Sequence, residues 1–149
     1  MITVRAVGWD DAAGVALRDA QQTEVSARYG VDDSEPGVKP SAADITLFLV
    51  AFDGDQPVGC GGLRALDASR GEVKRMYVVP GRRGTGVSTA ILRALEEAAR
   101  TLGWAELLLE TGTEQPDAMR FYEREGFTSI PNYGHYVGSA HSRCYAKDL

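Results

Sequence analysis

One segment of the chain, residues 71–92, limits the possible folds more than any other. It begins with a strand pattern, is interrupted by Pro80, passes through a loop with two arginines and three glycines, and ends in a helical pattern. A glycine-rich turn at a helix N-terminus leaves backbone N–H groups for an anion. Arginines at this place oppose the helix dipole unless an anion is bound. The segment therefore predicts a strand–loop–helix unit that holds a phosphorylated ligand.

Two commoner phosphate-binding motifs do not match this loop. A Walker loop ends in Gly-Lys-Ser/Thr, whereas Gly86 is followed here by Val87 and Ser88. A dinucleotide-binding fingerprint needs a third glycine where this chain has Thr89, and it should open the first strand–helix–strand unit. A plain turn with solvated arginines stays open as the simpler interpretation, because glycine-rich turns are common.

Length and composition indicate one domain that spans residues 1–149. Apolar residues make up 44% and charged residues 25%, so a core can form without metals or disulfides. The net charge of −5 argues against nucleic acid or an anionic membrane surface as a partner. Cys60 and Cys144 have no disulfide or ligand spacing, and His135 and His141 have no metal spacing. With no signal-peptide pattern and no long apolar run, we expect a cytoplasmic protein without a metal.

The periodicity of the apolar residues predicts the order of strands and helices. Strands are expected at 2–7, 45–52, 57–66, 72–79, 104–110, 127–137 and 142–147, and helices at 10–29, 84–102 and 116–125. Asp10 or Asp11 is the expected N-cap of the first helix, and Gly30 its end. Parallel strands within 72–110 and antiparallel hairpins outside them predict a mixed sheet of the α/β class. The polar stretch 30–44 is long enough to be a lid or binding loop.

Two motifs resemble the GNAT family of N-acetyltransferases. Residues 83–88 are similar to the family's Arg-x-x-Gly-x-Gly/Ala motif, with Ser88 in the last position. Residues 115–127 are similar to its Asn-x-x-Ala-x-x-x-Tyr-x-x-x-Gly-Phe segment, with Gln115 in place of Asn and with Tyr122 retained. The element order agrees with the family over nearly the whole chain. Three further segments, 72–78, 109–116 and 130–136, are similar to a bacterial subgroup of small-molecule acetyltransferases.

The resemblance implies a central mixed β-sheet of six to seven strands, with helices on both faces and a splay between two central parallel strands. Acetyl-CoA would lie across this splay, with its pyrophosphate on the glycine-rich loop and its thioester beside the backbone N–H of Val78. The implied cofactor contacts are Met76, Tyr77, Val78, Arg83, Gly84, Thr85, Gly86, Val87, Ser88, Gln115 and Tyr122.

The resemblance also implies direct attack of a primary amine on the thioester through a tetrahedral intermediate, which fixed N–H donors stabilise. Tyr122 is the expected general acid for the leaving thiolate, although an aromatic residue here would also suit a core. Glu72 is the expected base, directly or through water, and a solvated strand-end glutamate is an equal alternative. Glu110 and Glu24 are lesser candidates for the base.

The implied acceptor is a small-molecule amine, held between the first helix, the 30–44 loop and the segment near residue 133. The expected contacts are Glu24, Tyr29, Glu110 and Tyr133, although tyrosines at these positions can be ordinary packing. Lys74 and Arg75 could meet a substrate carboxylate, but strand alternation lets only one of two neighbours face the cleft easily.

Two alternative functions remain open at this point. A protein or peptide acceptor would need an open groove, which a long loop at 30–44 argues against. A non-catalytic acyl-CoA-binding domain would not need Tyr122, which this chain keeps. Pairing of two copies as a homodimer is a further expectation from the resemblance.

Overall fold

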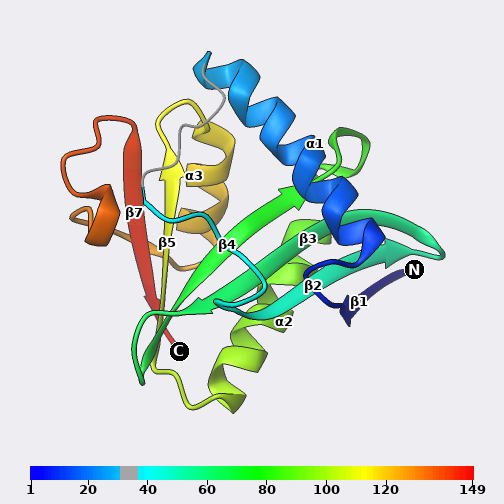
Figure 1. Cartoon of the computed structure of the whole chain (residues 1–149), viewed down its shortest axis with the longest axis horizontal. Helices are drawn as coiled ribbons and strands as arrows, with labels where there is room; N and C mark the ends of the chain where they lie inside the picture. The colour runs from blue at the N-terminus through cyan, green and yellow to red at the C-terminus, as the bar shows by residue number, and fades with distance from the viewer. Residues whose placement is uncertain (31–36) are drawn as a thin grey trace.

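Seven strands form one open sheet in the order β1-β2-β3-β4-β5-β7-β6 (Figure 1). The computed structural model describes residues 1–30 and 37–149. The strands are β1 (Ile2–Ala6), β2 (Ile45–Asp53), β3 (Gln56–Ala65), β4 (Arg70–Val78), β5 (Glu106–Gly112), β6 (Thr128–Ile130) and β7 (Ser142–Asp148). The α-helices are α1 (Ala12–Tyr29), α2 (Val87–Thr101) and α3 (Pro116–Arg124). None of the helices in the described ranges is long and apolar enough to cross a membrane.

The central strands β4 and β5 are parallel, and they stay paired over only part of their length. Their paired residues run from Arg70 and Glu106 to Glu72 and Leu108. Both strands continue beyond these pairs, so they separate, and each has an edge that is not joined to the other strand. The other neighbouring strands are antiparallel. The predicted mixed sheet with diverging parallel strands is confirmed.

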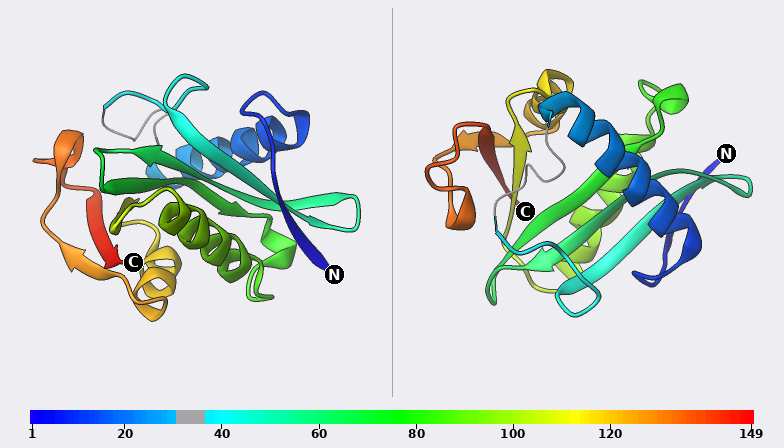
Figure 2. Two further views of the ribbon diagram at one scale, coloured as in Figure 1. Left: turned by 90° about the horizontal axis from the view of Figure 1, so that it is seen from below. Right: turned by 45° about the horizontal axis from the view of Figure 1, so that its top comes forward.

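Helices cover both faces of the sheet because β2 sends apolar side chains in both directions. Phe48 and Val50 are buried with Leu17 of α1. Leu49 and Ala51, which alternate with them, are buried in the cluster that contains α2. Figure 2 shows α1 on one side of the sheet and α2 and α3 on the other. Within α2 the deeply buried apolar side chains are Val87, Ile91, Leu92, Leu95 and Ala99.

The helix ends follow local chemistry. Asp11 caps α1, because its Oδ2 accepts hydrogen bonds from two backbone N–H groups of the first turn, at 3.1 and 3.4 Å. Gly30 ends α1 in the left-handed conformation at φ +69°. Helix α2 begins at Val87, three residues later than predicted. The delay arises because Gly84 and Gly86 have φ values of +75° and +93°, which a helix does not allow.

The predicted strand over residues 127–137 is wrong in its length. Strand β6 spans only Thr128–Ile130. Pro131 has no N–H for a ladder, and Gly134 turns the chain at φ +53° into a short 3₁₀ helix. The Asn132 side chain donates to two backbone carbonyls of the following turns, at 3.1 and 3.3 Å. These local hydrogen bonds replace strand pairing.

We predict that Gly71→Ala destabilises the protein. A Cβ at this position would lie 2.0 Å from Cζ3 of the buried Trp104, so the indole ring would have to move. We expect the free energy of unfolding to fall by about 1–3 kcal/mol, which is typical of an overpacked core. Urea unfolding measures the change. Gly8→Ala is the control, because its added Cβ would meet nothing within 4 Å. Equal stability of Gly71→Ala and wild type would contradict the packing of Trp104 against β4.

Candidate active site

A β-bulge in β4 shapes the open side of the splay. Between the pairs Gly62–Lys74 and Cys60–Tyr77, β4 has one residue more than β3, and Arg75 takes φ +58°. A long side chain at positive φ is uncommon and is often found at functional sites. The bulge interrupts the alternation of side chains, so Lys74 and Arg75 line the same cavity. The prediction that only one of them faces the cleft easily is therefore wrong.

Side chains from two neighbouring elements bind the carbonyl groups of the bulge. Gln21 of α1 donates from Nε2 to the carbonyl of Met76 at 2.9 Å. The Cys60 thiol donates to the carbonyl of Arg75 at 3.3 Å. Burial raises the pKa of the Cys60 thiol to about 12, so the thiol keeps its proton for this bond. The bulge is thus held by tertiary contacts in addition to strand pairing.

At the end of β4 a backbone donor points into the splay. The N–H of Val79 donates to the carbonyl of Val58 on β3 at 3.0 Å. Successive N–H groups of a strand point to opposite edges, so the N–H of Val78 points away from β3, toward the edge from which β5 has separated. A buried donor at such an edge requires an acceptor, which a ligand carbonyl can supply.

The glycine-rich loop delivers the N-terminus of α2 to the same region. Helix α2 has Gly86 as its N-cap and no side-chain cap, so the N–H groups of its first turn have no side-chain acceptor at the cap. Such groups bind phosphate well. Thr85 donates from Oγ1 to the carbonyl of Arg82 at 2.5 Å, which fixes the loop.

Both loop arginines are paired with carboxylates. Arg82 contacts Asp53 of the β2–β3 hairpin at 2.5 Å. Arg83 contacts Glu24 of α1 at 2.8 Å and donates from Nε to the carbonyl of Val78 at 3.0 Å. Protein carboxylates therefore already balance the charges of both arginines. A bound anion is not needed to explain why arginines lie at the helix N-terminus.

Glu24 has a different position from the one that its predicted role requires. It pairs with Arg83 and, at 3.0 Å, with Arg28, and it lines the larger of two cavities described below. The hydrogen bond from Arg83 holds the pKa of Glu24 below its usual value. This position supports a role in orienting Arg83 and does not support contact with an amine in the smaller cavity.

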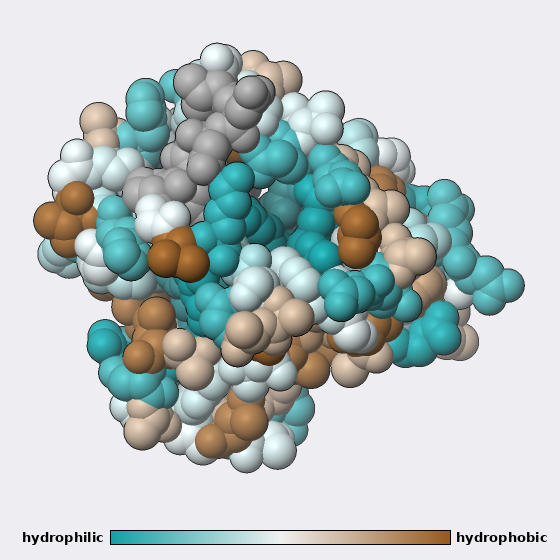
Figure 3. All heavy atoms as spheres, viewed as in Figure 1, coloured by the Kyte–Doolittle hydropathy of each residue, from teal (hydrophilic) through white to brown (hydrophobic). Residues whose placement is uncertain are grey.

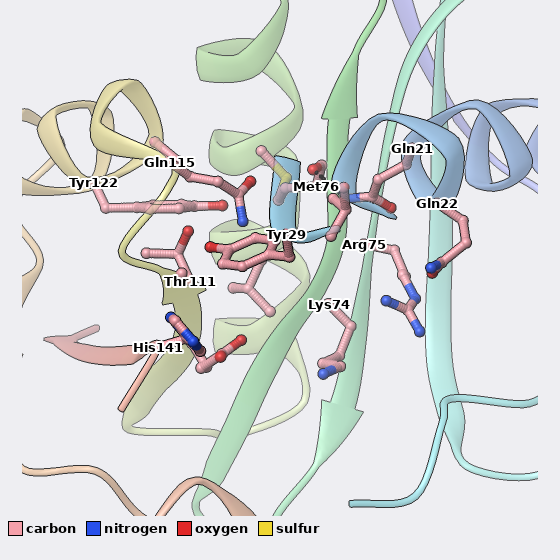
Figure 4. Close-up of a pocket in the computed structure, with 15 residues that line it drawn as sticks. Gln21, Gln22, Tyr29, Lys74, Arg75, Met76, Thr111, Gln115, Tyr122 and His141 are labelled. Atoms are coloured by element: carbon pink, nitrogen blue, oxygen red, sulfur yellow. Dashed lines mark hydrogen bonds between the residues drawn. The ribbon is translucent and has the colours of Figure 1, made fainter. Parts of the chain in front are cut away.

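Two adjacent cavities that share lining residues lie along the splay. The larger, of about 680 Å³, lies between α1, the end of β4, the glycine-rich loop and α3. Nine of the eleven predicted cofactor residues line it; Thr85 and the buried Val87 do not. The smaller, of about 120 Å³, lies between α1, β4 and β5 (Figure 4). The residues common to both linings are Gln21, Val25, Met76, Gln115, Ala118 and Tyr122. Hydrophilic side chains gather near the middle of the face that α1 crosses (Figure 3).

Tyr122 lies at the junction of the two cavities. Its ring packs edge-on against Phe121 and Phe127, with centroid distances of 5.2 and 5.6 Å. Its hydroxyl points into the cavity (Figure 4). Burial raises the pKa of Tyr122 above its usual value, so the phenol is protonated at neutral pH. Tyr122 is therefore both a core aromatic and a cavity residue.

The smaller cavity brings together residues from distant parts of the chain. Tyr29, at the end of α1, lies over Gly112, where a Cβ would be 1.5 Å from the Tyr29 hydroxyl. This hydroxyl accepts from the N–H of Glu114 at 3.2 Å. His141 packs edge-on against Tyr29, with a centroid distance of 5.8 Å, and lines the cavity. The sequence carries no signal for this position, because His141 is distinguished there only by its lack of metal spacing.

Glu110 is the only carboxylate among the described residues that line the smaller cavity. Its Oε2 accepts from the Ser142 hydroxyl of β7 at 2.7 Å. Of the predicted acceptor contacts, the structure brings Tyr29 and Glu110 into this cavity. No cluster of His, Cys, Asp and Glu within the described ranges could hold a metal ion.

Glu72 is buried in a separate polar network, with 2% of its surface exposed. Its Oε1 accepts from Arg64 at 3.0 and 3.3 Å, and its Oε2 accepts from Tyr133 at 2.5 Å and from Tyr136 at 3.2 Å. Burial and the charge of Glu72 raise the pKa of Tyr133. Neither Glu72 nor Tyr133 lines a cavity among those described. Their positions therefore do not support direct roles as base and acceptor contact.

The network of Glu72 reaches the smaller cavity through Lys74. Lys74 donates to the Tyr136 hydroxyl at 3.0 Å, and this hydroxyl donates to Glu72. Glu72 thus helps to fix a cation at the cavity wall while it anchors the segment between β6 and β7.

Sequence reasoning missed several cavity residues. They include Gln21, Gln22, Thr111 and Ala118, which line the smaller cavity. For Gln21 a signal was present, because it lies one helical turn after the buried Leu17 and one turn before Val25, on the face of α1 that meets the sheet. A polar residue on such a face is a candidate for a buried hydrogen bond.

Comparison with known proteins identifies the family. The sequence profile described as the Acetyltransferase (GNAT) family matches residues 15–127, which is more than half of the chain. The chain belongs to the GNAT family of acetyltransferases. The resemblance and the enzyme class predicted from the sequence are confirmed at this level.

Relatives and solved structures agree with this family. An IAA acetyltransferase of Azospirillum brasilense is 41% identical over 91 residues, which cover 60% of this chain and 59% of that protein. The match thus spans less than two thirds of that relative. A crystal structure of a Klebsiella pneumoniae protein, assigned as an acyl-CoA N-acyltransferase, has a TM-score of 0.85 at 27% identity and covers 100% of this chain and 98% of its own. An Elizabethkingia anophelis GNAT acetyltransferase with acetyl-CoA bound shares the fold, with a TM-score of 0.73 at 15% identity, covering 99% and 98%.

We predict that Glu72→Gln destabilises the protein. The change leaves the guanidinium of Arg64, whose side chain is 17% exposed, without its buried partner. We expect a loss of about 3 kcal/mol in the free energy of unfolding, at the low end for a broken buried pair because Asp44 also contacts Arg64 at 3.1 Å. Chemical denaturation measures it. Glu97→Gln is the matched control, because Glu97 is 79% exposed and 3.9 Å from Arg100. A Glu72→Gln protein as stable as its control would rule out this network as a structural anchor.

Proposed function

We propose that this protein transfers the acetyl group of acetyl-CoA to a primary amine of a small molecule. The observation that supports the proposal is that two adjacent cavities share Met76 and Tyr122 in their linings. The larger cavity would hold acetyl-CoA and the smaller would hold the acceptor. A cavity of about 120 Å³ favours a small acceptor over a peptide.

Backbone N–H groups would form the main contacts with acetyl-CoA. The pyrophosphate would bind at the N-terminus of α2, beside Gly86 and Ser88. The thioester end would lie along the open edge of β4, where the N–H of Val78 can bind a carbonyl. Acetyl-CoA bound to the Elizabethkingia neighbour of the same fold supports this choice of ligand.

The proposed reaction is a direct transfer. The amine nitrogen forms a bond to the thioester carbon, and the carbon–sulfur bond breaks as the tetrahedral intermediate collapses. Tyr122 donates a proton to the leaving thiolate, because its hydroxyl is at the junction of the cavities and is protonated. Glu110 receives the proton of the amine, directly or through water, since it lines the acceptor cavity and Glu72 does not. A cytoplasmic location and a homodimer stay predictions.

We predict that acetyl-CoA raises the melting temperature of the wild-type protein and that Ser88→Glu abolishes the shift. A ligand that binds only the native state stabilises it. A carboxylate near a helix N-terminus favours the helix itself, so Ser88→Glu should fold while it repels the pyrophosphate. Ala12→Glu is the matched control, at the start of α1 and away from the cavities. Absence of a shift in the wild type at millimolar acetyl-CoA would contradict the donor site.

We predict that Tyr122→Phe lowers kcat about 100- to 1,000-fold, within the range for loss of a general acid. The substitution keeps the ring that packs on Phe121 and Phe127, so the fold and the thermal shift with acetyl-CoA should be retained. Release of free CoA thiol with a panel of amines measures the rate. A Tyr122→Phe enzyme that binds acetyl-CoA normally and turns over as fast as wild type would eliminate Tyr122 as the acid.

A further inference from the structure

Strand pairing places a buried serine of β7 beside the carboxylate of Glu110. In the antiparallel register of β5 and β7, Glu110 pairs with Cys144 and Gly112 pairs with Ser142. Ser142 is therefore a diagonal neighbour of Glu110 on the same face of the sheet, within reach of its side chain. The Ser142 Oγ lies 2.7 Å from Oε2 of Glu110, and only 1% of the serine surface is exposed. The register thus fixes a buried hydroxyl on the carboxylate.

This face of β5 is the one that borders the smaller cavity. Side chains two residues apart point the same way along a strand, so Glu110 shares its face with Gly112. The Tyr29 hydroxyl occupies the place that a Cβ of Gly112 would take. Tyr29, Gly112 and Glu110 all line the smaller cavity, and Glu110 is only partly buried. The carboxylate that Ser142 holds therefore stays accessible from that cavity.

A second hydroxyl determines the direction of this hydrogen bond. The Ser139 Oγ lies 2.9 Å from the Ser142 Oγ. An ionised carboxylate only accepts hydrogen bonds, and a hydroxyl has one hydrogen to donate, so Ser142 donates to Glu110 and accepts from Ser139. The turn with both serines is itself held, because the Ser142 N–H and the Asn132 side chain donate to the Ser139 carbonyl at 3.4 and 3.3 Å.

We propose that Ser142 is a positioning residue for the acetyl transfer, with its hydroxyl holding the Glu110 carboxylate ionised and aimed at the acceptor amine. This inference rests on the proposed function, in which Glu110 receives the proton of the amine. In that step an N–H bond of the ammonium breaks, its electron pair stays on nitrogen, and the proton forms an O–H bond with Glu110. The hydrogen bond from Ser142 favours the charged carboxylate and keeps it in one orientation.

Other titratable groups face Glu110 from α1, β4, α3, β7 and the turn before β7. They line the same cavity or lie directly opposite Glu110 in the sheet: Tyr29, Lys74, Arg75, Tyr122, His141 and Cys144. Burial raises the pKa of the Cys144 thiol, so this thiol adds no charge at neutral pH. These groups are the same in the wild type and in variants of Ser142. A difference between the two proteins therefore reports the hydroxyl.

Three substitutions test the proposal. Ser142→Ala removes the hydroxyl, Ser142→Thr keeps a hydroxyl on the same Cβ, and Glu110→Gln removes the proton acceptor. Ser129→Ala is the matched control, because Ser129 is an exposed strand serine on β6. The acceptor is the best substrate from a panel of an amino acid, an amino sugar and a polyamine. The measurements are the kcat, the KM for the amine and for acetyl-CoA, the pH dependence of kcat/KM and the melting temperature.

For Ser142→Ala we expect kcat to fall about 10-fold, because a base that is no longer held is misplaced for part of the time. The acid limb of the kcat/KM profile should move up by about one pH unit, since the carboxylate loses a hydrogen bond to its charged form. The KM for acetyl-CoA should stay within about twofold of wild type. Ser142→Thr should restore the pH profile, even where its added methyl group lowers the melting temperature.

A double-mutant cycle shows whether Ser142 acts through Glu110. Glu110→Gln should lower kcat about 100-fold, and adding Ser142→Ala should lower it by no more than about twofold further. A purely structural role of Ser142 would give the same loss in both backgrounds and no shift of the pH profile. If Ser142→Ala does not fold, Ser139→Ala tests the same pair of hydroxyls, with a smaller shift in the same direction. A Ser139→Ala profile equal to wild type would then overturn the proposal.

Failure of this inference is distinguishable from failure of the proposed function. Wild-type kcat and pH profile in folded Ser142→Ala, with a large loss in Glu110→Gln, would overturn the role of Ser142 alone. Equal losses from Ser142→Ala in both backgrounds would also overturn it. Full activity of Glu110→Gln would eliminate Glu110 as the base and this inference with it, while acetyl transfer would stand. A wild-type protein that binds acetyl-CoA and acetylates no amine would overturn the proposed function.

Discussion

The loss of pairing between β4 and β5 beyond Glu72 and Leu108 is the constraint on which the rest of the site depends. Two parallel strands that separate inside a sheet expose backbone groups that must find other partners. One of these partners comes from the protein, because Gln21 of α1 binds the Met76 carbonyl. On the opposite edge of β4, Cys60 of β3 binds the Arg75 carbonyl at the bulge. The cavity along the separation is the space for a ligand to supply the others, so the binding site follows from a defect in strand pairing.

Buried charges hold the elements on both sides of this separation. Glu72 joins β4 to Arg64 of β3 and to Tyr133 and Tyr136 of the segment before β7. On the other face Glu96 of α2 is also buried, and it is paired with Arg93 and with Lys147 of β7 at 2.7 Å each. Each network connects β7, or the segment leading to it, with the other half of the sheet. Removing one partner would leave a buried charge uncompensated, which would lower the free energy of unfolding. These ion pairs therefore oppose separation of the elements that they join.

The sequence predicts the parts of the structure that depend on local chemistry. Asp11 and Gly30 bound α1 because capping and positive φ are properties of single residues. The loop before Val87 is recognisable because its glycines and its motif are contiguous. The bulge at Arg75 has no such signal, since nothing in an arginine predicts φ +58°. Glu96 lies on the buried face of α2 with Leu92 and Ala99, and its charge there is paired with Lys147, which is distant in sequence. These features arise from tertiary contacts, and the spacing of apolar residues along the sequence carries no information about such contacts.

This contrast explains why the sequence carries more signal for the larger cavity than for the smaller one. The larger cavity is lined by α1, the end of β4, the glycine-rich loop, the start of α2 and α3, and the family profile covers all of them. The smaller cavity combines Gln21, Glu110 and His141, which are separated by most of the chain. The segment from β6 to β7, which supplies His141 and the tyrosines that bind Glu72, lies beyond the matched residues 15–127. The smaller cavity therefore depends partly on a segment outside the family profile, whereas the strand separation and the glycine-rich loop lie within it.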